Sequence, residues 1–305
     1  MSYEVIFTTK KKLNIPKILL VIAILIFVIV ILAFTNYKIN YSKVENEINQ
    51  SINKFNDMES EREKAIKEQK QREENHAREL KRYAPLSSND IEKIDHIYSH
   101  SDQKRIFLTF DDGPTNQVTP YILDLLKNEN IKANFFVLGQ RAEQNPALVK
   151  REYEEGHFIG NHSFSHKYSS IYESIDSVFN EYNTTNDILK KATGNNNFNS
   201  LIFRFPGGAV GGPYNAIKQE ASQKLKEAGI SNVDWNALTG DAEGVTTKEG
   251  LFSRFVETAQ DKTSIVLLMH DASDKILTYE TLPDIIKYCR DNGYAFQTIY
   301  DLLER

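Results

Sequence analysis

An apolar segment near the start of the chain constrains its fold more than any other feature. From Ile18 to Thr35 every residue except the last is apolar, and Ile, Leu and Val dominate. As a helix, at about 1.5 Å per residue, this segment would be about 27 Å long, close to the ~30 Å hydrocarbon core of a bilayer. No face of it is polar, which disfavours a buried helix of a soluble domain. The pattern predicts a transmembrane anchor over residues 18–36, with the lipid bilayer as partner.

The charges before this segment predict its orientation. Lys10, Lys11, Lys12 and Lys17 precede the apolar run, and basic flanks tend to stay in the cytoplasm. We therefore expect a cytoplasmic N-terminus over residues 1–17 and a single-pass plasma membrane protein whose remaining residues lie outside. A cleaved signal peptide is the alternative, but its apolar region is normally shorter, and no A-x-A-like site follows here.

The next segment has a different composition. Residues 41–83 are dense in Glu, Lys, Arg, Asn and Gln and contain no Pro or Gly, while Val44, Ile48, Ile52 and Phe55 recur at helical spacing. Ala84–Asp90, with Pro, Ser and Asn, ends this helix. We predict an extracellular helical stalk and linker over residues 37–101. A solvated spacer is the preferred interpretation, and weak self-association through a coiled coil is the alternative.

Charge and cysteine content exclude some classes of function. The net charge of −5 and the isoelectric point of about 5.9 argue against a broad nucleic-acid-binding surface. The one cysteine, Cys289, cannot form an internal disulfide, and it excludes a zinc site built on several thiolates.

Residues 102–305 have the sequence pattern of a globular domain in which strands and helices alternate. Segments of helical character include Val118–Glu129, Ile171–Lys191 and Tyr214–Ala228. The seven apolar or β-rich runs between the helical segments are Ile106–Phe110, Ala133–Gly139, Phe158–Ser163, Leu201–Gly208, Ser231–Leu238, Ser264–His270 and Tyr294–Ile299. Such alternation predicts parallel strands and an α/β fold. Seven repeats suggest a small or incomplete β/α barrel, with an open doubly wound sheet as the alternative.

Unusual polar residues follow the predicted strands. The first strand runs into Asp111 and Asp112, and two adjacent carboxylates there are costly unless something uses them. His162 and His166, four residues apart after the third strand, can converge on one metal ion. Further along lie Arg204, Asp234, Trp235, Asp241 and His270. Each alone could be a turn, a cap or a core residue, but together they occupy the strand ends where active sites of β/α barrels assemble.

These residues resemble the motifs of the polysaccharide deacetylase family, also called the NodB-homology domain or carbohydrate esterase family 4. The five motifs, in the family's order and spacing, are Thr109–Pro114, His162–His166, Arg204–Pro206, Asp234–Trp235 with Asp241, and Leu268–His270. The resemblance covers roughly residues 104–300, so we assign residues 102–305 to this domain. It implies a distorted barrel with fewer than eight strands, a distorted (β/α)7 barrel here.

The resemblance also implies a role for each motif residue. Asp112, His162 and His166 would hold one divalent metal ion, usually Zn²⁺, with Co²⁺, Ni²⁺ and Mn²⁺ as alternatives. Asp111 would be the general base, paired with Arg204, and His270 the general acid, oriented by Asp241. Trp235 and Leu268 would line the pocket for the acetyl methyl group.

One position departs from the family pattern. An aromatic residue often follows the proline of the third motif, but here the residue is Gly207. Its main-chain N–H, which the family uses to bind the oxyanion, is retained. One aromatic wall of the substrate groove is lost, which leaves the identity of the substrate in doubt.

The expected function is hydrolysis of N-acetyl groups on an acetylated glycan polymer at the cell surface. A metal that polarises the amide carbonyl, with a base and an acid on either side, suits this reaction. An anchor and a stalk favour peptidoglycan GlcNAc or MurNAc residues as substrate. Exopolysaccharide, chitin or xylan deacetylation stays open, as does a catalytically silent glycan-binding or scaffold protein.

Overall fold

A computed structural model describes residues 15–305 of the chain. It divides into two compact units, the first ending at Glu74 and the second running from Asn75 to Arg305. The basic residues Lys10, Lys11 and Lys12, on which the predicted orientation partly depends, lie outside the described residues.

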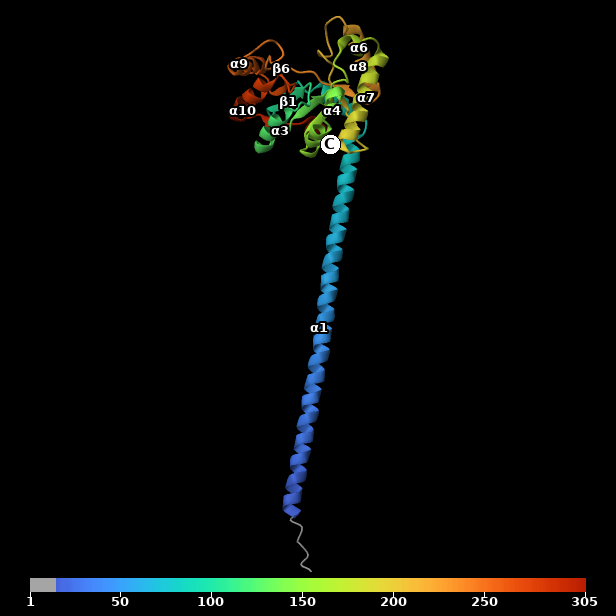
Figure 1. Ribbon diagram of the computed structural model, residues 1–305, viewed down its shortest axis with the longest axis vertical. Helices are drawn as coiled ribbons and strands as arrows, with labels where there is room; N and C mark the ends of the chain where they lie inside the picture. Colours follow the sequence, from blue (N-terminus) through green and yellow to red (C-terminus); the bar gives the residue numbers. More distant parts are fainter. Residues whose placement is uncertain (1–14) are drawn as a thin grey trace, which may run out of the picture. The chain divides into compact units, whose positions relative to one another are not determined.

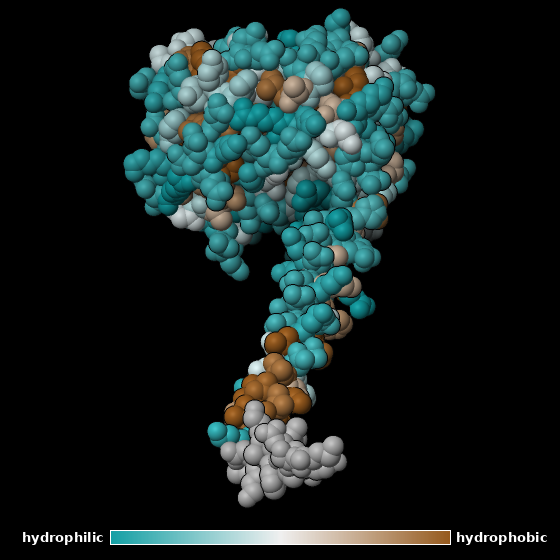
Figure 2. All heavy atoms as spheres, turned by 60° about the horizontal axis from the view of Figure 1, so that its bottom comes forward, coloured by the Kyte–Doolittle hydropathy of each residue, from teal (hydrophilic) through white to brown (hydrophobic). Residues whose placement is uncertain are grey.

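The described part of the first unit is one helix, which continues into the second unit. Helix α1 spans Ile15–Tyr83, and its apolar part leaves large side chains such as Phe27 and Ile29 more than 60% exposed. From Leu19 onward, α1 is long and apolar enough to cross a membrane, with a mean hydropathy of 3.1 in its most apolar window. It is the one helix among the described residues that meets this criterion. A signal sequence would meet the same criterion. Figure 1 shows the helix, and Figure 2 shows its apolar band in brown.

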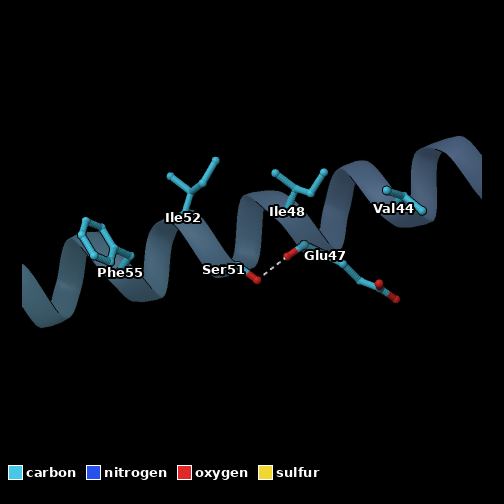
Figure 3. Close-up of a pocket in the computed structure, with 6 residues that line it drawn as sticks. All are labelled: Val44, Glu47, Ile48, Ser51, Ile52 and Phe55. Atoms are coloured by element: carbon cyan, nitrogen blue, oxygen red, sulfur yellow. Dashed lines mark hydrogen bonds between the residues drawn. The ribbon is translucent and has the colours of Figure 1, made fainter.

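The charged part of α1 keeps a short apolar stripe. Val44, Ile48, Ile52 and Phe55 are each at least half exposed. Figure 3 shows Ile48 and Ile52 on the same side of the helix, with the hydroxyl of Ser51 donating to the main-chain oxygen of Glu47 at 2.8 Å. The stripe spans only about three turns, so self-association through it stays a prediction.

The second unit is built on a parallel sheet. Its strands are β1 (Arg105–Asp111), β2 (Asn134–Val137), β3 (Phe158–Asn161), β4 (Ile202–Phe203), β5 (Ser231–Asn232), β6 (Ala237–Leu238), β7 (Ser264–His270) and β8 (Ala295–Phe296). The strand order is β5-β4-β3-β2-β1-β7-β6, and β8 pairs with the start of β1. Every pairing is parallel. The predicted α/β fold with a distorted barrel of parallel strands is therefore confirmed, with eight strands in the described residues where the sequence predicted seven.

The fifth predicted strand differs from the expectation. Residues 231–238 form two short strands, β5 and β6, which lie at opposite ends of the strand order. Residues 233–236 between them therefore connect the two ends of the sheet, which must curl to bring those ends so close. Between the two strands, the Asp234 carboxylate accepts from the main-chain N–H of Ala209, and the Asp234 main-chain oxygen accepts from Arg204 instead of from a neighbouring strand.

Helices surround the strands, as Figure 1 shows for α3, α9 and α10 on one side and α7 and α8 on the other. The helices of this unit, besides the end of α1, are α2 (Ser88–Asp95), α3 (Thr119–Asn128), α4 (Gly139–Gln144), α5 (Pro146–Glu154), α6 (Tyr168–Ile171), α7 (Ile175–Thr193), α8 (Asn215–Glu227), α9 (Lys248–Ala259), α10 (Ile276–Asp291) and α11 (Ile299–Leu303). Their apolar faces pack on strands such as β1 and β7, which are buried almost throughout, as expected for parallel strands covered on both faces.

Residues before the first strand also belong to this core. Tyr83, Leu86, Ile94 and Ile97 are buried in the same apolar cluster as the strands. Ser87 caps α2 with a capping box, which fixes the start of this short helix. The domain boundary that the sequence suggests at residue 102 stays a prediction, and the compact unit begins at Asn75.

Candidate metal and catalytic site

The polar residues predicted from the sequence lie at the carboxyl ends of four strands, along one edge of the sheet. Asp111 and His270 end β1 and β7 and are direct register partners. His162 follows β3 and Arg204 follows β4, which are neighbouring strands. Since parallel strands end at the same edge of a sheet, residues from four separate segments converge there.

Asp112, His162 and His166 form a cluster suited to a metal ion. Their ligand atoms all lie within 4.8 Å of one another. The Oδ1 atom of Asp112 is 3.6 Å from Nε2 of His162 and 3.4 Å from Nε2 of His166. This Oδ1 is buried and has no hydrogen-bond partner. An orphaned carboxylate oxygen facing two imidazoles fits a divalent cation held by two histidines and one carboxylate.

The protonation of His162 suits a metal ligand. Its Nδ1 lies 2.8 Å from the main-chain oxygen of Arg204, so Nδ1–H donates and Nε2 keeps a free lone pair. Burial lowers the pKa of His162 to about 3, with a further lowering from the neighbouring His166 and Arg204. The ring is therefore neutral at physiological pH, which is the form that binds metal.

The backbone is strained where these ligands lie. Asp112, Ser163 and His166 have φ values of 72°, 72° and 56°, in the left-handed region. Such conformations in residues other than glycine cost of order 1–3 kcal/mol each and persist where the surroundings enforce them. Here they turn two ligand side chains toward a common point.

Glu181, which the sequence analysis did not single out, binds the histidine loop, the turn from His162 to His166. Glu181, in the middle of α7, accepts hydrogen bonds from the main-chain N–H groups of Phe164 and Ser165, both at 2.7 Å, and from the Ser165 hydroxyl at 2.8 Å. Three bonds to one carboxylate fix the turn between His162 and His166. Nothing in the sequence distinguishes Glu181 from the other polar residues of its helix, because the loop that it binds lies 16 residues earlier.

Asp111 lies beside the cluster in a different environment from its neighbour. Its Oδ1 accepts from Nη1 of Arg204 at 2.8 Å, and its Oδ2 is 3.8 Å from Nε2 of His162. Burial raises the pKa of Asp111 above its ordinary value, and the charge of Arg204 offsets part of that rise. The two adjacent aspartates thus have different partners, as the sequence interpretation required.

Arg204 is itself completely buried, and its guanidinium makes four hydrogen bonds. Its guanidinium also donates to the Thr109 hydroxyl and to the main-chain oxygens of Val233 and Asp234. It stacks over the ring of Phe136, 3.8 Å from the centroid. A buried cation with this many acceptors is fixed in one position, and it fixes Asp111 in turn.

His270 and Asp241 form a second pair on the other side of Asp111. His270 Nδ1 lies 2.9 Å from Oδ1 of Asp241, whose Oδ2 accepts from the His270 main-chain N–H and the Thr278 hydroxyl, both at 2.8 Å. Burial alone would lower the pKa of His270, but the hydrogen bond and charge of Asp241 outweigh it and raise the pKa to about 9. The same pairing lowers the pKa of Asp241. His270 therefore carries a proton at neutral pH, with Nε2 free to donate it.

The predicted substrate-binding residues occupy three different settings. Leu268 lies two residues before His270 on β7, on the same face of the strand. Trp235 is half-buried, with its ring centroid 5.9 Å from the Arg204 guanidinium. Gly207 has a φ of 75°, which favours glycine, and a side chain there would collide with the hydroxyl of Tyr168.

Tyr168 was not identified from the sequence. It is 42% exposed, and its ring centroid is 5.6 Å from that of His166. An aromatic ring therefore borders Gly207 after all, contributed by α6 instead of by the third motif. The position is set by the fold of the histidine loop, so no local signal could have indicated it.

Another buried acid, Asp271, contacts the loop that follows Asp111 and Asp112. Asp271 is 1% exposed, and its side chain accepts from the Thr119 hydroxyl at 2.5 Å. Its main-chain oxygen accepts from the Thr115 hydroxyl at 2.7 Å, and its carboxyl lies directly against Gly113. Burial raises the pKa of Asp271 to about 7. These contacts connect the end of β7 to residues 113–119 and leave no space for a side chain at residue 113.

Comparisons with known proteins agree with this geometry. The family described as Polysaccharide deacetylase matches residues 99–233. A "Peptidoglycan-N-acetylglucosamine deacetylase" of Bacillus cereus is 35% identical over 207 residues, covering 67% of this chain and 90% of that protein. The Listeria monocytogenes "Peptidoglycan-N-acetylglucosamine deacetylase PgdA" is 35% identical over 226 residues, or 73% of this chain, which spans only 43% of that longer relative.

A solved structure shares the fold. A Streptococcus mutans "CE4 esterase" is similar with a TM-score of 0.61 and 34% identity, covering 70% of this chain and 92% of that one. The matched share of the chain is close in size to the second compact unit.

Proposed function

Because the chain belongs to the polysaccharide deacetylase family, we propose that it hydrolyses N-acetyl groups of a cell-surface glycan in a metal-dependent reaction, with peptidoglycan GlcNAc or MurNAc residues as substrate. One observation carries this proposal: the Asp112, His162 and His166 cluster lies beside a buried carboxylate, Asp111, whose register partner on the next strand is a protonated histidine, His270. Amide hydrolysis needs a base for the attacking water and an acid for the leaving amine, and this arrangement supplies both.

The metal ligands are assigned to Asp112, His162 and His166. A divalent cation held by them would polarise the acetyl carbonyl and lower the pKa of water from 15.7 to about 7. We propose Zn²⁺, since two imidazoles and one carboxylate with open positions suit it. Co²⁺, Ni²⁺ and Mn²⁺ tolerate the same ligands.

Asp111 acts on the attacking water. Its carboxylate accepts the proton as the water oxygen bonds to the acetyl carbon, and Arg204 keeps the carboxylate oriented. The main-chain N–H of Gly207 would donate to the oxyanion that forms on the carbonyl oxygen.

His270 acts on the leaving group. As the carbon–nitrogen bond breaks, Nε2 gives its proton to the amine nitrogen, and acetate and a free amino sugar result. Asp241 holds Nδ1, fixes the orientation of the ring and stabilises its positive charge. Trp235 and Leu268 would enclose the acetyl methyl group.

The substrate is inferred from the relatives, which are named peptidoglycan deacetylases. Since the chain spans less than half of the Listeria protein, the polymer is a proposal that rests on the shared unit. Exopolysaccharide, chitin or xylan would offer the same acetyl chemistry. A silent glycan-binding protein is the remaining alternative, but it would have no need for the buried Asp111–Arg204 and Asp241–His270 pairs.

Acetate release is the direct test. The full chain, purified in detergent micelles and supplied with Zn²⁺, should release acetate from isolated peptidoglycan and should lose this activity in chelator. Chelator-resistant release would contradict the metal dependence. Glycan binding without acetate release from peptidoglycan, chitin oligomers or acetylated xylan would favour the silent alternative.

The anchor and topology are part of the proposal. We infer that the helix segment from residues 18 to 36 spans the plasma membrane, with residues 1–17 inside and the stalk and enzymatic domain outside. Protease added to intact cells should digest the domain. Protection until lysis would refute the orientation, and a mature protein beginning after residue 35 would show that the segment is cleaved.

A further inference from the structure

A polar hollow adjoins two of the candidate metal ligands, Asp112 and His166. It has a volume of about 320 Å³, at the lower end of the range for ligand pockets. Asp112 and His166 line one side, and Gln140, Arg141 and Gln144 of helix α4 line the other. Because it opens beside the metal cluster, a polymer whose acetyl group reaches the metal would place a neighbouring group in this hollow.

The charge of Arg141 is unmatched in this hollow. The side chain is half-buried, and its one hydrogen bond is a long contact from Nη1 to Oε1 of Gln144, at 3.4 Å. Across residues 15–305 no carboxylate forms an ion pair with it, whereas Arg151 on the next helix, α5, pairs with both Asp124 and Glu155. A guanidinium presents a planar fork of donors that matches a carboxylate.

We propose that Arg141 is a substrate-binding residue that pairs with a carboxylate on the group next to the acetylated sugar. This inference rests on the proposed function and sharpens it. The flanking side-chain amides of Gln140 and Gln144 can form hydrogen bonds with hydroxyl groups. The hollow therefore combines neutral donors and acceptors with one permanent positive charge. Two sources of the carboxylate fit this chemistry: the lactyl ether of a muramic acid residue, or the peptide attached to it.

The inference explains how an acidic chain can prefer an acidic polymer. The net charge of −5 disfavours anionic glycans in general. A half-buried guanidinium beside the metal cluster would supply local attraction where the polymer must be positioned. It would also make the enzyme prefer carboxylate-bearing glycans over neutral polymers such as chitin. Recognition of the acetyl group alone cannot give this preference, because both kinds of polymer carry it.

The test compares three glycans with the full chain in detergent micelles and saturating Zn²⁺. They are a neutral N-acetylglucosamine oligomer, peptidoglycan strands freed of peptides by an amidase, and strands that keep their peptides. Wild type should have a lower KM for one or both carboxylate-bearing glycans. Arg141→Gln should raise that KM by about two- to fivefold, the upper range for a partly exposed charge pair, with kcat within about twofold.

Two control variants accompany it. Arg141→Lys keeps the charge and should recover part of the affinity. Arg254→Gln removes an exposed guanidinium that pairs with Glu257 on α9, and it should change nothing. The neutral oligomer should be hydrolysed equally by all variants, which shows that fold and chemistry are intact.

The outcomes separate the two proposals. If only the peptide-free strands respond to Arg141→Gln, the lactyl carboxylate is the ligand; if only the peptide-bearing strands respond, the peptide is. An equal KM change on the neutral oligomer, or no change on any glycan, refutes the inference alone. If wild type releases no acetate from any glycan, the proposed function is wrong, and dissociation constants for the same three glycans then decide the inference, since equal values for wild type and Arg141→Gln would refute it.

Discussion

The two sides of the site differ in how their polar atoms are partnered. On the acid side Asp241 accepts three hydrogen bonds, from two groups of His270 and from Thr278. On the metal side Oδ1 of Asp112 is buried with no hydrogen-bond partner and faces two imidazole nitrogens. Since a buried polar atom without a partner is costly, the Asp241 carboxylate is satisfied by protein groups alone, whereas Oδ1 of Asp112 has room for a cation as its partner. This difference predicts which substitutions remove the metal and which remove only the chemistry.

The largest effect is expected on the metal side. Asp112→Ala removes the one carboxylate of the ligand set, so the full chain should lose both its bound metal and its acetate release, the latter to background. Elemental analysis and acetate release, measured on the same preparation, test this. Asp124→Ala, a change at an exposed aspartate, should keep both. A fully active Asp112→Ala enzyme would show that the ligand assignment is wrong.

The neighbouring aspartate should separate metal binding from rate. Asp111→Asn keeps the size and polarity of the side chain but removes the base. The metal should remain while turnover falls by roughly 10²–10⁴-fold, the usual contribution of general acid–base catalysis. Near-normal turnover would leave the reaction without its assigned base.

His270→Ala should behave in the same way, because this histidine acts on the leaving amine and its nearest bonded partner is Asp241. Turnover should fall by roughly 10²–10⁴-fold with metal content unchanged. Loss of the metal from this variant would make His270 a ligand and would require another acid.

Asp241→Asn is expected to have a smaller effect with a distinct pH signature. The pKa of His270 is raised from 6.5 to about 9, with Asp241 opposing the effect of burial. The acid form is present below that pKa, so activity should fall as pH rises through about 9. Without the Asp241 charge the pKa falls, and the alkaline limb of the kcat profile should move to lower pH, with about tenfold lower turnover at pH 7. An unmoved limb would mean that another group sets it.

The smallest effect is expected for the residue that supports the ligands indirectly. Glu181→Gln removes the negative charge and leaves one acceptor oxygen where two now accept the three hydrogen bonds from Phe164 and Ser165. Metal affinity should fall by about tenfold, as for other residues that orient ligands, while turnover at saturating metal should change little. Titration with Zn²⁺ measures this, and Glu154→Gln, at an exposed position, is the matched control. Unchanged affinity would limit Glu181 to a structural role.

Much of this site could be predicted from the sequence, because its residues follow apolar strands at short, regular distances. Asp111, Asp112, His162 and His166 lie within two residues of a strand end or in the turn that follows, so local pattern and family resemblance locate them together. The resemblance is confirmed by the relatives, while the individual roles stay predictions that the experiments above address.

The sequence by itself determined the apolar helix, the strand–helix alternation and the polar residues at the strand ends, since each depends on neighbours within one or two turns or strands. Only the tertiary structure decided that residues 231–238 form two strands at opposite ends of a curled sheet, that Glu181 holds the histidine loop and that Tyr168 borders Gly207. It also placed the unpaired Arg141 beside the metal cluster. These contacts join residues that are distant in sequence or that meet only through the path of a loop, and their proximity depends on how the sheet curls and the loops turn, which no local periodicity encodes.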